Sequence, residues 1–141
     1  MRYKVNDEKV FADVTDGIAI LIEMESGMYY GMNLFTTAVF ENIIGGADTE
    51  ELLSALTKVK GYDEDIRSKC TEFIRELTEK EFIAENPAAT ATVMLSFDEF
   101  PKEELDFVLS SFPDAYELLL ADPIHQVKEE EGWKPNKGVL K

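Results

Sequence analysis

The chain has 141 residues, of which 45% are hydrophobic and 30% are charged. These values are typical of a folded globular protein and exclude wholesale disorder. With 14 Lys and Arg against 29 Asp and Glu, the net charge is −15, which argues against nucleic acid and anionic membrane surfaces as main partners.

Residue types used in catalysis and metal binding are scarce. The chain has one histidine, His125, and one cysteine, Cys70, so it can form neither an internal disulfide nor a Cys/His zinc site. We find no phosphate-binding glycine loop and no dinucleotide fingerprint. Asp122 could form a catalytic pair with His125, but no nucleophile lies near them, so ordinary polar roles are favoured. We therefore expect no catalytic residues, no metal and no cofactor.

The same features predict a location. No basic segment is followed by a long apolar stretch, and the longest purely apolar run, residues 18–22, is too short to span a bilayer. A single cysteine suits a reducing compartment. We expect a cytoplasmic protein that does not contact membranes.

Taken in chain order, residues 9–32 predict three β-strands. Val10, Ala12 and Val14 alternate with other side chains, and Asp16-Gly17 is a turn signal. A second strand, rich in isoleucine, covers residues 18–24, and Gly27 closes the short break before a third strand at residues 28–32. Short connections predict an antiparallel meander with the third strand on an edge.

Three helices are expected next. Asn33 is a good N-cap for the first, and Gly45-Gly46 ends it. Asp48-Thr49 caps the second, which Gly61 ends. The third opens at Tyr62 or Asp63 and carries an apolar stripe of Ile66, Cys70, Phe73, Ile74 and Leu77. The predicted fold class is α+β: a three-stranded antiparallel sheet followed by a three-helix bundle of winged helix-turn-helix proportions.

A run of small residues at 88–92 is the best candidate domain boundary, which divides the chain into residues 1–88 and an extension at 89–141. In the extension we expect a short strand at residues 93–95 and helices at 101–109 and 113–120, with a mostly irregular remainder. The single tryptophan, Trp133, is expected to dock this extension on the domain.

Winged-helix proportions raise the possibility of a DNA-binding regulator. The third helix and its flanks, residues 63–81, carry a net charge of −3. A recognition helix that faces phosphates needs the opposite sign. This function is therefore the least favoured alternative.

The third strand suggests peptide binding instead. Residues 28–32 contain neither a charge nor a proline, the devices that usually protect an exposed sheet edge. Such an edge is a template for an added strand. Two alternatives stay open: the chain's own C-terminal part covers this edge, or a second copy does so in a homodimer.

The ordered motifs resemble the PqqD-like family. The resemblance is carried by Gly27-Met28-Tyr29-Tyr30-Gly31-Met32-Asn33, by the helix ending in Gly45-Gly46, by Thr49-Glu50-Glu51-Leu52, and by Phe73-Ile74-Arg75-Glu76-Leu77 followed by Phe82-Ile83. It covers residues 5–86, and it departs from the family pattern at Met32, where leucine is usual.

The resemblance implies peptide recognition without catalysis. Family members hold the leader of a ribosomally made precursor peptide and present it to a modifying enzyme, often a radical SAM protein. The leader adds a strand beside the third strand, in the groove against the third helix. Carried over by position, the peptide-binding residues would be Met28, Tyr29, Tyr30, Gly31, Met32, Ile66, Arg67, Lys69, Cys70, Phe73, Ile74 and Leu77. For the helix residues, a place in the core is the competing interpretation. The main alternative function is a self-associating or tail-covered scaffold that binds no leader.

Overall fold

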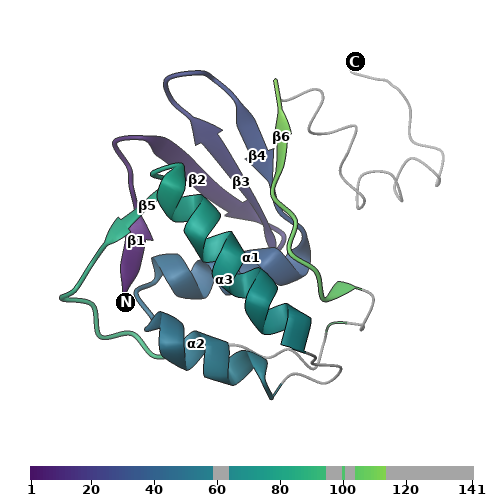
Figure 1. Cartoon of the computed structure of the whole chain (residues 1–141). Helices are drawn as coiled ribbons and strands as arrows, with labels where there is room; N and C mark the ends of the chain where they lie inside the picture. Colours follow the sequence, from purple (N-terminus) through teal and green to yellow (C-terminus); the bar gives the residue numbers. More distant parts are fainter. Residues whose placement is uncertain (59–63, 95–99, 101–103, 114–141) are drawn as a thin grey trace.

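The computed structural model describes residues 1–58, 64–94, 100 and 104–113 (Figure 1). Its elements are, in chain order, β1 (Tyr3–Val5), β2 (Val10–Thr15), β3 (Ile18–Glu23), β4 (Tyr29–Gly31), α1 (Leu34–Ile44), α2 (Thr49–Leu56), α3 (Glu64–Glu79), β5 (Ile83–Glu85) and β6 (Ser110–Phe112). The α+β class, with three helices and antiparallel sheets, is therefore confirmed. Within the described ranges, no helix is both long enough and apolar enough to span a bilayer.

The predicted meander is present as β2, β3 and β4. Adjacent strands pair antiparallel, with Val10 opposite Glu23 and Leu21 opposite Tyr30. The β2–β3 turn has Asp16 at φ 55° and Gly17 at φ 79°. Positive φ at both central residues is what a tight hairpin turn requires, because it matches the twist of the strands.

The sheet has a fourth strand, β6, in the C-terminal part of the chain. The alternative in which that part covers the edge of the third strand is therefore confirmed, although no strand was predicted at these residues. β6 pairs antiparallel with β4, so β4 is not the sheet edge, and the order is β2-β3-β4-β6. The helix expected over residues 101–109 is wrong in its described part, because residues 105–109 are not helical. Leu105, Phe107 and Leu109 recur at a spacing of two, which is the period of an extended chain and not that of a helix.

A separate two-stranded sheet joins the two ends of the N-terminal region. β1 pairs antiparallel with β5, with Tyr3 opposite Glu85. Strands of three residues are too short to show a period of two, so neither β1 nor β5 was predicted from the sequence. The strand expected at residues 93–95 is absent at Val93 and Met94. Leu95, the opening of α3 at residues 62–63 and the helix expected after Pro113 lie outside the described residues.

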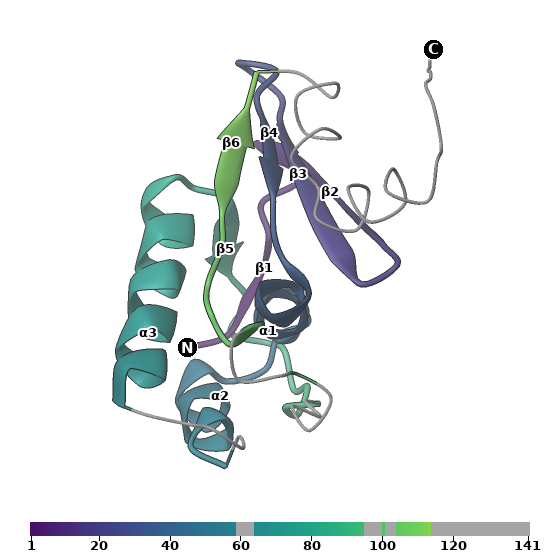
Figure 2. The same ribbon diagram turned by 90° about the vertical axis from the view of Figure 1, so that its right-hand side faces the viewer.

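The core lies between the helices and one face of the four-stranded sheet. Figure 2 shows α3 beside that face, with β6 along the edge of the sheet and α1 across its lower end. The largest fully buried side chains are Phe35, Phe40, Phe82, Leu21, Ile43, Leu52, Leu56 and Leu77. Asn33 and Asp48 cap α1 and α2 through their side-chain oxygens, as predicted.

The chain after β5 returns along α1. The side-chain amide of Asn42 donates to the carbonyl oxygen of Met94 at 3.2 Å, and its oxygen accepts from the Met94 N–H at 2.7 Å. Asn42 is 8% exposed, so this pair of bonds anchors the backbone of Met94 to the domain. The chain then reaches Glu104 near the start of α1, ten residues later.

Candidate functional site: a groove that holds an extended segment

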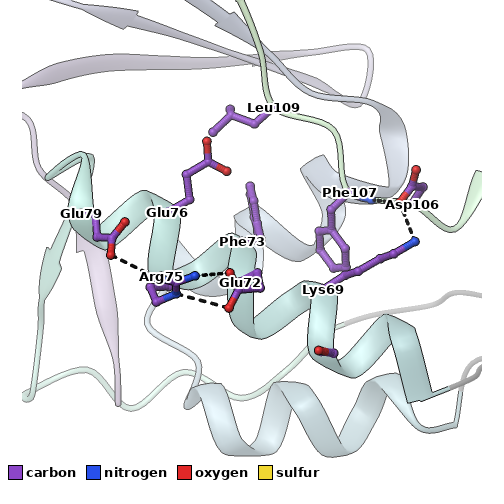
Figure 3. Close-up of a pocket in the computed structure, with 10 residues that line it drawn as sticks. Lys69, Glu72, Phe73, Arg75, Glu76, Glu79, Asp106, Phe107 and Leu109 are labelled. Carbon is purple, nitrogen blue, oxygen red and sulfur yellow. Dashed lines mark hydrogen bonds and ion pairs between the residues drawn. The ribbon is translucent and has the colours of Figure 1, made fainter.

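Residues 104–112, which we call the docked segment, lie between α3, β4 and the first turn of α1. The ring of Phe107 is the aromatic anchor of this segment, and Leu105, at 8% exposed, is its most buried side chain. Its centroid lies 5.1 Å from that of Phe35 on α1 and 5.3 Å from that of Phe73 on α3. Aromatic rings at these distances stabilise one another beyond the burial of their area. A cleft beside Phe107 runs along α3 and is lined by Lys69, Glu72, Phe73, Glu76, Phe107 and Leu109 (Figure 3).

The backbone of β4 forms one wall of the groove. Across β3 and β4, the hydrogen-bonded pairs include Ala19 with Met32 and Glu23 with Met28. Bonding direction alternates along an antiparallel strand, so Tyr29 and Gly31 direct their backbone groups away from β3. They face Phe112 and Ser110 of β6. The N–H of Ser111 consequently points away from β4.

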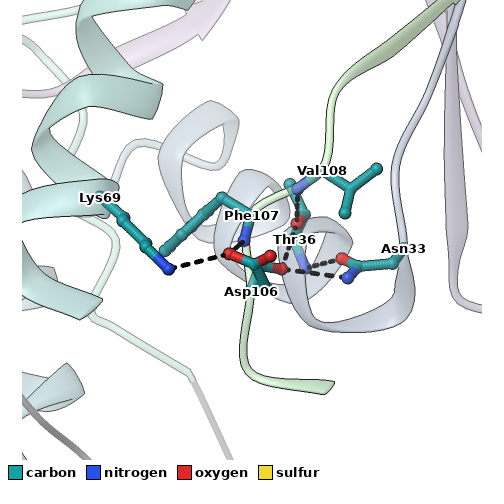
Figure 4. Close-up of polar contacts among 6 residues, drawn as sticks. All are labelled: Asn33, Thr36, Lys69, Asp106, Phe107 and Val108. Atoms are coloured by element: carbon teal, nitrogen blue, oxygen red, sulfur yellow. Dashed lines mark hydrogen bonds and ion pairs between the residues drawn. The ribbon is translucent and has the colours of Figure 1, made fainter. Parts of the chain in front are cut away.

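The first turn of α1 binds the backbone of the docked segment directly. The Thr36 hydroxyl donates to the carbonyl oxygen of Asp106 at 3.2 Å and accepts from the N–H of Val108 at 2.8 Å. The Asn33 side-chain amide donates to the same Asp106 carbonyl at 3.0 Å (Figure 4). These contacts require only an extended main chain, and they do not depend on the side chains of the segment.

One charged contact adds side-chain selectivity. Lys69 Nζ lies 3.3 Å from Asp106 Oδ1. Both side chains are more than half exposed, at 52% and 59%, so this ion pair contributes specificity more than stability. Arg75, six residues further along α3, is held within its own helix by Glu72 and Glu79. The hydrogen bond to Glu72, followed by the charges of both glutamates, raises the pKa of Arg75.

The five predicted residues of the third strand fall into two groups. Tyr29, Tyr30 and Gly31 pair with Phe112, Ser111 and Ser110, so all three border the docked segment, and half-buried Met28 precedes them. Tyr30 contacts the edge of Phe82 at a centroid distance of 5.1 Å, and Lys80 Nζ lies 5.5 Å from its ring centre. Met32 is only 4% exposed and belongs to the core.

The predicted helix residues divide in the same way. Phe73 and Lys69 contact the docked segment, whereas Ile66, Cys70 and Leu77 are core side chains that are at most 5% exposed. Arg67 and Ile74 are half-buried. Burial raises the pKa of the Cys70 thiol to about 12, so this thiol is neutral near pH 7. Whether these residues bind a peptide stays a prediction.

Thr36, Asp106 and Phe107 were not predicted from the sequence, and Asn33 was predicted only as a helix cap. A threonine at the third position of α1 is unusual for a capping box, in which Glu or Gln stands there. That position, together with the alternation of Leu105, Phe107 and Leu109, was the available signal. Among the described residues, no group of three His, Cys, Asp or Glu side chains could hold a metal ion.

Together, the fold and the groove define a small α+β domain in which β4, α1 and α3 hold an extended segment of the same chain. Residues 18–83 match the family model described as Coenzyme PQQ synthesis protein D (PqqD). This match confirms, over residues 18–83, the resemblance to the PqqD-like family seen in the sequence. None of the curated proteins and none of the solved structures is significantly similar to this chain.

Proposed function

We propose that this protein is a non-catalytic adaptor that binds an extended peptide as an added strand beside β4. The docked segment is the observation that supports this proposal. It lies in the groove as a peptide ligand would, with a strand paired to β4 and an aromatic side chain between Phe35 and Phe73.

The contacts in the groove match recognition by strand addition. In that mode, main-chain hydrogen bonds supply affinity and side-chain pockets supply specificity. Here β4, Asn33 and Thr36 contact main chain, whereas the aromatic pocket and Lys69 contact side chains. A short added strand with one anchor forms a modest interface, so we expect a dissociation constant on the order of 1 μM, or about −8 kcal/mol.

The match to the PqqD family model supports a more specific proposal. The peptide would be the leader of a ribosomally made precursor, and the partner would be its modifying enzyme, of which a radical SAM protein is one candidate. The family match covers residues 18–83, which include β3, β4, α1 and α3. These elements supply every wall of the groove.

A second function also has a specific observation in its favour. Because β6 covers β4, the protein could be a closed scaffold whose own segment permanently completes the sheet. The two functions differ in one measurable respect: only the adaptor binds a separate peptide in this groove.

The test begins with affinity capture of the tagged full-length protein from its native host, followed by mass spectrometry of bound peptides. A captured peptide would be synthesised and titrated against the full-length protein and its Gly31→Pro variant. Proline removes the Gly31 N–H that faces the added strand, so we expect binding to weaken at least tenfold while the thermal melt still shows a folded protein. Equal binding by both proteins would exclude strand addition beside β4. Failure to capture any peptide, or to bind any member of a library of extended nonapeptides, would favour the closed scaffold.

A further inference from the structure

We propose that the docked segment is a built-in ligand, which an external peptide of the same pattern replaces. This inference rests on the proposed function, because it concerns the same groove. It adds the side-chain pattern of the peptide and the competition that controls its access.

The docked segment contacts the domain as a ligand contacts a receptor. Leu105 is its only side chain less than a tenth exposed, at 8%. Phe107, Val108 and Leu109 are half-buried, and Ser110 and Ser111 are exposed. Most of its polar contacts use its own main chain, at Asp106, Val108 and the β6 ladder.

The side-chain contacts define which peptides fit. Asp106 meets Lys69, and the next residue, Phe107, enters the pocket between Phe35 and Phe73. The paired strand starts three residues later, at Ser110. The matching external ligand is a peptide with a carboxylate, an aromatic residue directly after it, and an uncharged extended stretch beginning three residues further on.

The tether makes the docked segment a strong competitor. It follows Met94, whose backbone is anchored by Asn42, by only ten residues. A segment tethered at that length has an effective concentration on the order of millimolar. An external peptide therefore meets an occupied groove, and its apparent association constant equals the intrinsic constant multiplied by the fraction of molecules whose groove is open.

Two proline variants of the full-length protein distinguish release of the docked segment from a general loss of folding. Ser110→Pro removes an N–H that faces β4, whereas Ser111→Pro removes one that points away from it. Proline is tolerated in a strand where its missing N–H faces solvent, so Ser111→Pro is the matched control. The probe is a fluorescein-labelled peptide with the sequence of residues 104–112, Glu-Leu-Asp-Phe-Val-Leu-Ser-Ser-Phe, titrated by fluorescence anisotropy. Two variant peptides test the pattern: one has alanine in place of the phenylalanine that corresponds to Phe107, and the other has asparagine in place of the aspartate that corresponds to Asp106.

We expect Ser110→Pro to bind the probe at least tenfold more tightly than the wild type and Ser111→Pro, with all three proteins folded by circular dichroism. We also expect the alanine peptide to bind Ser110→Pro at least tenfold more weakly than the unaltered probe does, and the asparagine peptide to be weakened by a smaller factor. If Ser110→Pro is folded and binds the probe no better than the wild type, the built-in ligand is excluded. Equal and tight binding by all three proteins would exclude competition between the docked segment and the external peptide, but it would still agree with the proposed peptide-binding function. If none binds the probe while another extended peptide binds all three, the pattern is wrong and the function again stands.

Discussion

The docked segment and the domain beneath it are held by different kinds of contact. In the domain, side chains such as Leu21, Phe40 and Leu77 are at most 1% exposed and belong to one hydrophobic cluster. In the docked segment, the equivalent role falls to Leu105 and to half-buried Phe107. The remaining contacts are a short ladder, a few hydrogen bonds and an exposed ion pair.

This difference indicates that the domain carries its own stability. Burial of apolar area is the main source of folding free energy, and most of that area lies in β2–β4 and the three helices. Polar contacts at a surface can be exchanged for water at small net cost. We therefore predict that the groove can be emptied while the domain stays folded, which is what an exchangeable ligand requires.

The largest expected effect on the free energy of unfolding comes from truncating a side chain in the domain core. Leu77→Ala removes a side chain that is fully buried against other core residues, and such truncations lower the free energy of unfolding by about 2–5 kcal/mol. Leu109→Ala, the same change in the docked segment, should cost about 1 kcal/mol because Leu109 is only half-buried. Urea denaturation measures both values. Equal losses would mean that the docked segment is an integral part of the core.

The next effect is a dependence of stability on pH that arises from Cys70, a buried residue of the domain and not of the docked segment. Burial raises the pKa of Cys70 from its ordinary value of 9.0 to about 12. Since the neutral thiol is the form that the folded protein favours, its contribution is complete below pH 9 and is lost as the pH rises towards 12. Between these values, stability should fall by at most about 1.4 kcal/mol per pH unit. Urea denaturation from pH 8 to pH 10 tests this, and Cys70→Ala should show a correspondingly weaker dependence.

Removing the aromatic anchor should free the docked segment and spare the domain. Phe107→Ala deletes ring contacts with Phe35 and Phe73, each worth about 0.5–1.5 kcal/mol. We expect a loss of about 1–2 kcal/mol in docking and a marked increase in amide exchange along β6, with β2–β3 amides unchanged. Phe11→Ala, at a phenylalanine that is 56% exposed on β2, is the matched control and should change neither. Increased exchange throughout the sheet would contradict the division between segment and domain.

The same division explains what could be predicted from the sequence. The meander, the three helices and their caps follow from local signals: Asp16-Gly17 in a turn, Asn33 and Asp48 as caps, and a helical period in α3. The β4–β6 pairing joins residues about eighty positions apart, so no local pattern specifies it. Pro101 suggested a helix because proline is common at the first helical position, and only the alternation of Leu105, Phe107 and Leu109 pointed to an extended chain.

The candidate site shows the same limit. Gly31, Lys69 and Phe73 were predicted and do border the docked segment. Met32 and Cys70 were predicted with them but lie in the core. A sequence pattern shows which residues share one face of a helix or strand, but it does not show which of them the rest of the protein buries. Thr36 was missed because its role depends on a partner seventy residues away.

A smaller effect on docking is expected from removing the Thr36 hydroxyl, which binds the backbone of the docked segment. Thr36→Val keeps the shape of the side chain but removes its bonds to the Asp106 carbonyl and the Val108 N–H. Loss of such a bond costs about 1 kcal/mol, so exchange at Val108 should increase about fivefold. Thr71→Val, at an exposed position of α3, is the control. Unchanged exchange at Val108 would show that Thr36 does not hold the segment.

The smallest effect on stability should come from Lys69, yet it bears most directly on specificity. Lys69→Met removes an ion pair between two exposed groups, which contributes less than about 1 kcal/mol. On a protein with a net charge of −15, however, this lysine is the cation that meets the carboxylate of a bound segment. We expect the Ser110→Pro/Lys69→Met double variant to bind the 104–112 probe severalfold more slowly than Ser110→Pro in 50 mM salt and equally fast in 500 mM salt, because screening removes electrostatic steering. Stopped-flow anisotropy measures these rates, and Ser110→Pro/Lys58→Met controls for the loss of one positive charge elsewhere. If both double variants slow binding equally, net charge alone sets the rate, and the carboxylate position in the peptide pattern is not read by Lys69.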